Sequence, residues 1–147
     1  MARSVREIPA PAGVVFDVLL DPETYPDWLV GAKEIRAVDD NWPEVGSRFH
    51  HRVGLAGPIT VADSTKVLAI DAPNLLSLEV RARPLGRGRA TFTLKADGPD
   101  PAPGCRVQID EEPIGTLSPL HPLLAPFIKA RNDKSLDQLA ALVRTRV

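Results

Sequence analysis

The stretch FIKARNDKSLDQLAALVRTRV, residues 127–147, decides the fold. It contains neither proline nor glycine, and apolar residues recur along it at helical spacing, at Ile128, Leu136, Leu139, Leu142 and Val143. A helix of about 20 residues is roughly 30 Å long, enough to cross a small domain. The stretch therefore predicts one long C-terminal helix whose apolar face needs a covering layer. The preceding residues 115–126 contain prolines, so we expect an irregular segment there.

The rest of the chain predicts a β-sheet that covers this helix. Seven runs are typical of strands, at residues 2–8, 34–39, 46–55, 59–70, 75–83, 87–96 and 105–112. Short turns link most of them, which favours antiparallel neighbours. Two short helices, 14–20 and 22–28, are expected after the first strand. The fold class is therefore α+β, with a seven-stranded curved antiparallel sheet wrapped around a long C-terminal helix.

Length and composition indicate one ordinary globular domain, residues 1–147. The 18 basic and 19 acidic residues nearly cancel, which argues against nucleic acid as a partner. A single cysteine, Cys105, excludes an intramolecular disulfide and a zinc site built on several cysteines. No apolar run approaches the roughly 20 residues of a membrane span, and no signal peptide is recognisable. We therefore expect a cytoplasmic protein without integral membrane association.

Six pieces of sequence extend over almost the whole chain: PAGVVFDVL (11–19), DPETYPDW (21–28), VGSRF (45–49), DAPNLL (71–76), GCRV (104–107) and RNDKSLDQL (131–139). In this order and spacing they resemble the START-like superfamily, also called SRPBCC. That superfamily includes birch-pollen-allergen-type proteins and bacterial polyketide cyclase/dehydrase-like proteins. The resemblance implies a helix-grip fold with an apolar ligand cavity. It implies no particular ligand, because the family has no shared catalytic motif.

Strand periodicity places two titratable side chains on the apolar side of the sheet. His51 shares its face with Phe49, and Glu111 shares its face with the apolar residues of the last strand. Asn132 joins them from the predicted helix, four residues after Ile128. In a cavity of low polarity, a histidine and a carboxylate could hold a ligand hydroxyl or carbonyl, or act as acid and base. The alternatives are structural: Glu111 in water at the open end of the sheet, His51 on a backbone group, and Asn132 on the backbone of a neighbouring loop.

Large aromatic residues are scarce, at 5%, so the sequence permits an apolar ligand cavity between sheet and helix. We expect its lining to include Tyr25, Trp28, Phe49, His51, Leu78, Phe92, Ile109, Glu111, Ile128 and Asn132. Tyr25 and Trp28 could instead form a packing plug between the short helices and the sheet. The facing of Asp63 and Thr65 is ambiguous, because the apolar residues of strand 59–70 change phase, as a β-bulge would explain.

Three functions fit these features. The first is binding of a small apolar ligand (a lipid, an isoprenoid or an aromatic polyketide), which needs no cofactor. The second is a polyketide cyclase/dehydrase-type enzyme that uses His51 and Glu111 as catalytic acid and base. The third is a protein-interaction module that uses the outer face of the helix or a cluster of arginines, namely Arg81, Arg83, Arg87 and Arg89.

A solvated sheet face, balanced by Asp110 and Glu112, is the alternative explanation of those arginines. No metal site is expected, since the adjacent His50 and His51 point to opposite faces of one strand. The sequence contains no feature that indicates an oligomeric state.

Overall fold

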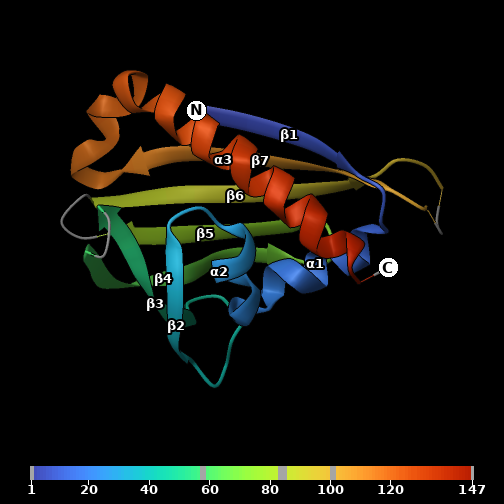
Figure 1. The fold of residues 1–147 in the computed structure, drawn as a ribbon, viewed down its shortest axis with the longest axis horizontal. Coiled ribbons are helices and arrows are strands. Elements are labelled where there is room, and N and C mark those ends of the chain that lie inside the picture. Colours follow the sequence, from blue (N-terminus) through green and yellow to red (C-terminus); the bar gives the residue numbers. More distant parts are fainter. Residues whose placement is uncertain (1, 57–58, 83–85, 100–101, 147) are drawn as a thin grey trace.

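The seven predicted strands form one antiparallel sheet in the computed structural model, which describes residues 2–56, 59–82, 86–99 and 102–146. The strands are β1 (Ala2–Ile8), β2 (Ala32–Val38), β3 (Arg48–Ala56), β4 (Ile59–Asp71), β5 (Leu75–Ala82), β6 (Gly86–Ala96) and β7 (Cys105–Ile114). Their order across the sheet is β1-β7-β6-β5-β4-β3-β2. From β2 to β7, strands that are consecutive in the sequence are therefore neighbours in the sheet. β1 lies at one edge, next to β7 (Figure 1).

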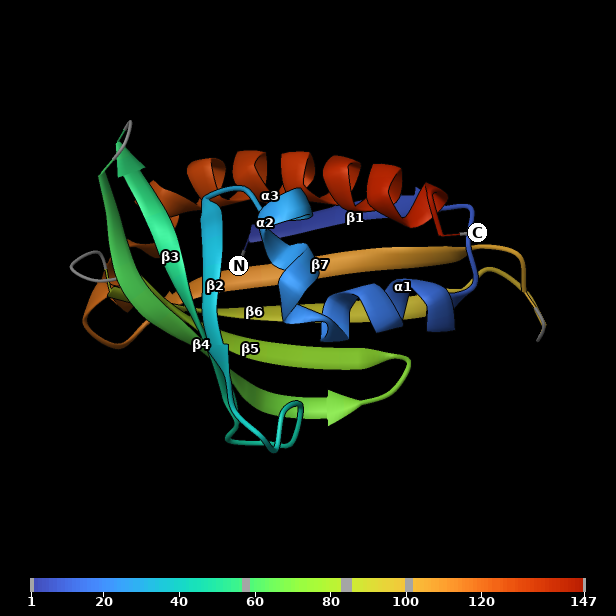
Figure 2. The same cartoon turned by 60° about the horizontal axis from the view of Figure 1, so that its bottom comes forward.

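The helices lie on one face of this sheet (Figure 1). α1 (Ala12–Leu20), the 3₁₀ turn η1 (Pro22–Thr24) and α2 (Tyr25–Trp28) follow β1, and the 3₁₀ segment η2 (Gly115–Leu120) leads into α3 (His121–Arg144). Figure 2 shows the sheet curling while α3 lies across its open side. The predicted α+β, helix-grip architecture is thus confirmed, since a curved sheet covers a helix of 24 residues.

The long helix begins earlier than its sequence predicts. Residues 115–126 were expected to be irregular because of their prolines, yet η2 is a 3₁₀ helix and α3 already starts at His121. Pro122 lies in the first turn, where a backbone N–H would have no helical partner in any case. Pro126 lies inside the helix, where a proline removes one hydrogen bond and its ring crowds the carbonyl one turn earlier. The expectation for this segment was therefore wrong, because residues 121–126 belong to α3 despite their prolines.

A β-bulge in β4 explains the change of phase along that strand. The pairing of β4 with β5 shifts register between Val67 and Ala69. Before the bulge, Thr65 and Val67 are buried, and Asp63 is buried as well. After it, Ile70 packs against the core from the other parity. Thr65 therefore faces the interior of the sheet, next to His51 in β3.

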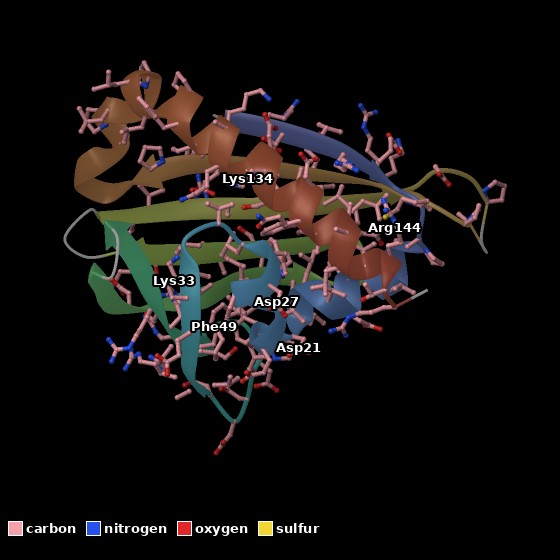
Figure 3. All side chains as sticks on the ribbon, in the orientation of Figure 1. Asp21, Asp27, Lys33, Phe49, Lys134 and Arg144 are labelled. Carbon is pink, nitrogen blue, oxygen red and sulfur yellow. The ribbon has the colours of Figure 1, made fainter. Side chains whose placement is uncertain are left out.

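The core lies between the sheet and the helices. α3 contributes the buried face Leu136, Leu139, Ala140 and Val143, whereas Lys134 and Arg144 lie on its exposed side (Figure 3). Each fully buried leucine or phenylalanine stabilises the fold by roughly 1.5–3 kcal/mol. Ser135, on the same helix, accepts a hydrogen bond from the backbone N–H of Val30 at 3.0 Å. This bond ties the connection after α2 to α3, beside the region described next.

Candidate functional site

An interior cavity of about 70 Å³ lies between the sheet, α3 and the connection after α2. Apolar side chains of four strands form most of its wall, and polar groups enter from two sides. The lining consists of Tyr25, Leu29, Val30, Gly31, Ala32, His51, Thr65, Leu78, Val80, Ala90, Phe92, Ile109, Glu111, Arg131 and Asn132. We call this space the inner cavity.

His51 is one of the polar residues that line the inner cavity. Its side chain is 4% exposed, and its Nε2 lies 2.9 Å from the hydroxyl of Thr65. Burial lowers the pKa of His51 below 6.5, although the Ser64 backbone and the Asp63 carboxylate act in the opposite direction. The imidazole is therefore neutral at pH 7. Its Nδ1 is buried without a hydrogen bond of good geometry, and the backbone of Ser64 interacts with the imidazole, as the structural alternative for His51 expects.

Glu111 is a second polar residue in the lining of the inner cavity. Its Oε1 accepts a hydrogen bond of 3.2 Å from the side-chain amide of Asn132, and its Oε2 pairs with the guanidinium of Arg131. The Glu111 side chain is 10% exposed and that of Arg131 is 39% exposed. The carboxylate is thus a partly buried ion with both oxygens engaged, which is the arrangement that a charge removed from water requires.

This arrangement corrects the structural alternatives for two residues. Glu111 does not lie in open water, because it is buried against α3. Asn132 bonds the Glu111 side chain, and the neighbouring connection is held instead by Ser135, three residues further along the helix. The Asn132 amide and the Ser135 hydroxyl both lie on the sheet-facing side of α3. Helical periodicity alone therefore could not predict which groups they bond.

The structure brings together most of the residues expected to line a ligand site. The inner cavity includes Tyr25, His51, Leu78, Phe92, Ile109, Glu111 and Asn132. Trp28 and Phe49 lie in the core outside this lining, because other aromatic rings cover them. Trp28 packs edge-on against Phe92 at 6.0 Å, and Phe49 packs against Tyr25 at 4.9 Å and Trp42 at 5.0 Å between ring centroids. Ile128 lines a different space, described below.

Tyr25 and Trp28 combine packing with hydrogen bonds to their own segment. The Tyr25 hydroxyl donates to the carbonyl of Leu19 at 2.6 Å, and the indole N–H of Trp28 donates to the Thr24 hydroxyl at 3.1 Å. Burial raises the pKa of the Tyr25 hydroxyl, with a further contribution from Asp21. Both polar groups are therefore used inside the fold, while the ring of Tyr25 also forms part of the cavity wall.

A second, larger space of about 350 Å³ adjoins the inner cavity, and we call it the outer groove. It lies where the ends of β5, β6 and β7 meet the first turns of α3. Its lining consists of Val80, Gly86, Arg87, Gly88, Glu111, Pro113, Leu124, Phe127, Ile128 and Arg131. Val80, Glu111 and Arg131 line both spaces, so the Glu111–Arg131 ion pair lies at the boundary between them.

Arg131 and Thr65 are the polar lining residues that sequence reasoning missed. A signal for Arg131 existed, since a carboxylate predicted to face inward needs a cationic partner. Arg131 follows Ile128 by one helical turn and precedes Asn132, which places it near the sheet-facing side of α3. The sequence does not fix the facing of Thr65, because the bulge in β4 hides the period-two pattern.

Two arginines of the β5–β6 hairpin are paired with carboxylates. Arg87 pairs with Glu79 at 2.7 Å and Arg89 pairs with Glu112, while Arg83 lies outside the described residues. Among the residues that the structure covers, no three His, Cys, Asp or Glu side chains gather as a metal site would need. None of the described helices is both long and apolar enough to cross a membrane.

Comparison with solved structures gives the same architecture. Protein NE0264 from Nitrosomonas europaea is similar over 99% of this chain and 94% of its own, with a TM-score of 0.75 and 18% identity. Ara h 8.0201 is similar over 97% and 96%, with a TM-score of 0.70 and 16% identity. StfQ, a di-domain ARO/CYC protein from the steffimycin biosynthetic pathway, is similar over 97% of this chain and 45% of its own, with a TM-score of 0.71 and 15% identity. At these identities the likeness concerns the fold.

No curated protein matches the sequence. A family profile does match it, however, across residues 2–144, and that family is described as polyketide cyclase/dehydrase and lipid transport. The match covers every strand and helix of the fold, including both walls of the inner cavity. With the helix-grip architecture and these structural neighbours, it shows that the chain belongs to the polyketide cyclase/dehydrase and lipid transport family, within the SRPBCC superfamily.

Proposed function

We propose that the protein binds a small hydrophobic ligand between the sheet and α3. The inner cavity carries this proposal, because its wall is mainly apolar and only a few polar groups converge on it. His51 offers one polar contact, and the Glu111–Asn132–Arg131 cluster offers another. A ligand with an apolar body and one or two oxygen atoms suits this wall. Lipids, isoprenoids and aromatic polyketides all have that character.

The volume of the inner cavity sets a condition on binding. A cavity on the order of 150 Å³ is needed to hold a benzene ring, which is about twice the 70 Å³ present. A ligand of the proposed classes must therefore displace part of the wall. Leu29, Val30, Gly31 and Ala32 are only half-buried, whereas the strand residues opposite them are mostly buried. The connection after α2 is thus the wall segment whose displacement exposes least of the core.

A cavity-filling variant tests this proposal. Ala90 is buried in β6 and lines the inner cavity, so Ala90→Leu places a larger side chain in the ligand space. Thr93 is exposed on the same strand, so Thr93→Leu is the matched control. Isothermal titration with neutral probes from benzyl alcohol to dodecan-1-ol should show binding to the wild type and to Thr93→Leu, and at least tenfold weaker binding to Ala90→Leu. Equal affinity in all three proteins would remove the inner cavity as the binding site.

A second candidate function is acid–base catalysis of the polyketide cyclase/dehydrase type. Its support is the buried, neutral His51 in the wall of the inner cavity, together with the similarity to StfQ, which is an ARO/CYC protein. In an aldol cyclisation, His51 would take a proton from the carbon beside a carbonyl. The enolate would add to a second carbonyl, and the proton would return to the new alkoxide.

Glu111 fits the role of a second acid or base less well than His51 does, because Arg131 and Asn132 already occupy both of its oxygens. The two functions differ in the effect of His51→Ala. Removal of a general base lowers turnover by about 10²–10⁴-fold, whereas removal of one contact to a carried ligand lowers affinity only modestly. Turnover of a poly-β-keto substrate by the wild type and by His51→Ala therefore separates an enzyme from a binding protein.

A further inference from the structure

Among the described residues that line the outer groove, cations outnumber carboxylates. Arg87 and Arg131 both line the outer groove, and Glu111 is the one carboxylate among the described residues that line it. Arg87 is paired with Glu79, but Glu79 also lies 3.7 Å from the ammonium group of Lys66. Arg87 therefore shares its carboxylate with a second cation, whereas Arg131 is the one cation that the structure pairs with Glu111 among the described residues.

Arg131 also has an unused donor. One of its terminal nitrogens pairs with Glu111, but its Nε is buried and makes no hydrogen bond with the described residues. A guanidinium has five N–H groups in a planar fork and can serve two carboxylates at once. A buried N–H without an acceptor costs free energy, so an acceptor supplied by a ligand would be bound favourably.

Apolar surface surrounds these arginines. Leu124, Phe127 and Ile128 of α3 face the groove together with Val80 and Pro113 of the sheet. Phe127 is 72% exposed, which leaves its ring available to a ligand in the groove. The inner cavity alone is far below the roughly 300–1,000 Å³ of small-molecule sites, but with the 350 Å³ of the outer groove the space falls within that range.

We propose that the ligand is an amphipathic monocarboxylate that occupies both spaces. Its carboxylate lies in the outer groove between Arg131 and Arg87, and its apolar chain passes the Glu111–Arg131 pair into the inner cavity. This inference rests on the proposed function and specifies its ligand. One carboxylate supplies the acceptor that the buried Nε of Arg131 lacks, and it adds a negative charge beside Arg87, which shares Glu79 with Lys66. Arg131 keeps Glu111 on one edge and takes the ligand on another, so the two carboxylates need not meet.

The experiment compares two probes that differ only in the head group, dodecanoate and dodecan-1-ol. Titration can be followed by tryptophan fluorescence, because the ring of Trp28 lies 6.0 Å from that of Phe92 in the cavity wall. We expect the wild type to bind dodecanoate at least tenfold more tightly than dodecan-1-ol, as one charge-assisted hydrogen bond implies. Arg131→Gln and Arg87→Gln should each abolish most of this preference. Lys129→Gln, which removes an exposed cation of α3 paired with Asp133, should leave it intact.

Glu111→Gln provides a test that does not depend on the arginine variants folding. It removes the carboxylate that competes for Arg131, so the affinity for dodecanoate should rise about tenfold while that for dodecan-1-ol stays unchanged. Equal affinity of the wild type for both probes, or a preference for dodecanoate that survives both arginine substitutions, would overturn the inference. Binding of dodecan-1-ol without any preference would overturn it and leave the proposed function standing. Failure of both probes and of the smaller neutral probes would overturn both.

Discussion

The side-chain amide of Asn132 lies 3.2 Å from Oε1 of Glu111, while the next residue back along α3, Arg131, holds the other oxygen of the same carboxylate. Two consecutive residues of the long helix thus grip one side chain of β7. The contact joins the helix to the sheet at the boundary of the two cavities. It therefore contributes both to the stability of the fold and to the shape of the candidate site.

The Glu111–Arg131 pair should show strong coupling in a double-mutant cycle. Arg131→Leu leaves a buried carboxylate with only an amide partner, and we expect a loss of about 1–3 kcal/mol of unfolding free energy, below the value for a fully buried pair because Arg131 is partly exposed. Adding Glu111→Leu should restore most of the loss, since two apolar side chains can pack there. Urea unfolding of the four proteins measures the cycle. Additive effects of the two substitutions would contradict the prediction.

Stability should fall as pH drops below neutrality, and His51 should account for a distinct part of the fall. The folded protein lowers the pKa of His51 below its ordinary value of 6.5, so the unfolded chain binds more protons between the two values. The contribution of His51 is complete above about pH 6.5 and is lost as pH decreases toward its folded pKa. In His51→Gln this component should vanish. Chemical unfolding of both proteins from pH 7.5 to 5 gives the difference, and identical slopes would argue against a buried neutral ring.

Cys105 should be inert toward thiol reagents while the protein is folded. The residue is buried, and desolvation raises the pKa of its thiol to about 11, with Asp97 and Glu7 contributing in the same direction. At pH 8 roughly one thiol in a thousand is therefore ionised, and the thiolate is the reactive form. Labelling with Ellman's reagent should be at least a hundredfold slower in buffer than in guanidinium chloride. Rapid labelling of the native protein would show that this end of β7 opens readily.

Tyr25→Phe should affect stability more than ligand binding. The hydroxyl donates to the carbonyl of Leu19, and its loss should cost about 1 kcal/mol, because that buried carbonyl loses its side-chain donor. The ring that lines the inner cavity remains in place, so the affinity for neutral probes should change less than threefold. If binding weakens by tenfold or more while stability is unchanged, the hydroxyl serves the ligand, and the packing role is wrong.

The fold could be predicted from the sequence because each element carries a strong local pattern. The apolar stripe of α3 and the short turns between strands together leave few alternatives to a curved sheet around a helix. The inward facing of His51 and Glu111 also followed from period-two alternation, since each lies on a strand with clear apolar neighbours. Thr65 could not be placed in this way, because the bulge at Val67 breaks the alternation in its strand.

Sequence periodicity could not predict which side chains bond the inward-facing residues. Arg131 is a long side chain that is partly exposed yet reaches the buried carboxylate, and such side chains carry no apolar signature. The volume of the inner cavity was equally unpredictable. It depends on how the rings of Tyr25, Trp28 and Phe49 pack, and a change of a few ångströms in their positions decides whether space is left.

The pairing of β1 with β7 also decides when the site can come into existence during synthesis. Ala2 lies opposite Glu111, and Ile8 lies opposite Cys105, so β1 must wait for about a hundred further residues before it finds its partner strand. α3, which supplies Arg131 and Asn132, is translated later still. In a ribosome-bound chain that lacks β7 and α3, the inner cavity is not yet formed. A ligand can therefore stabilise only the finished protein, and it cannot guide the early steps of folding.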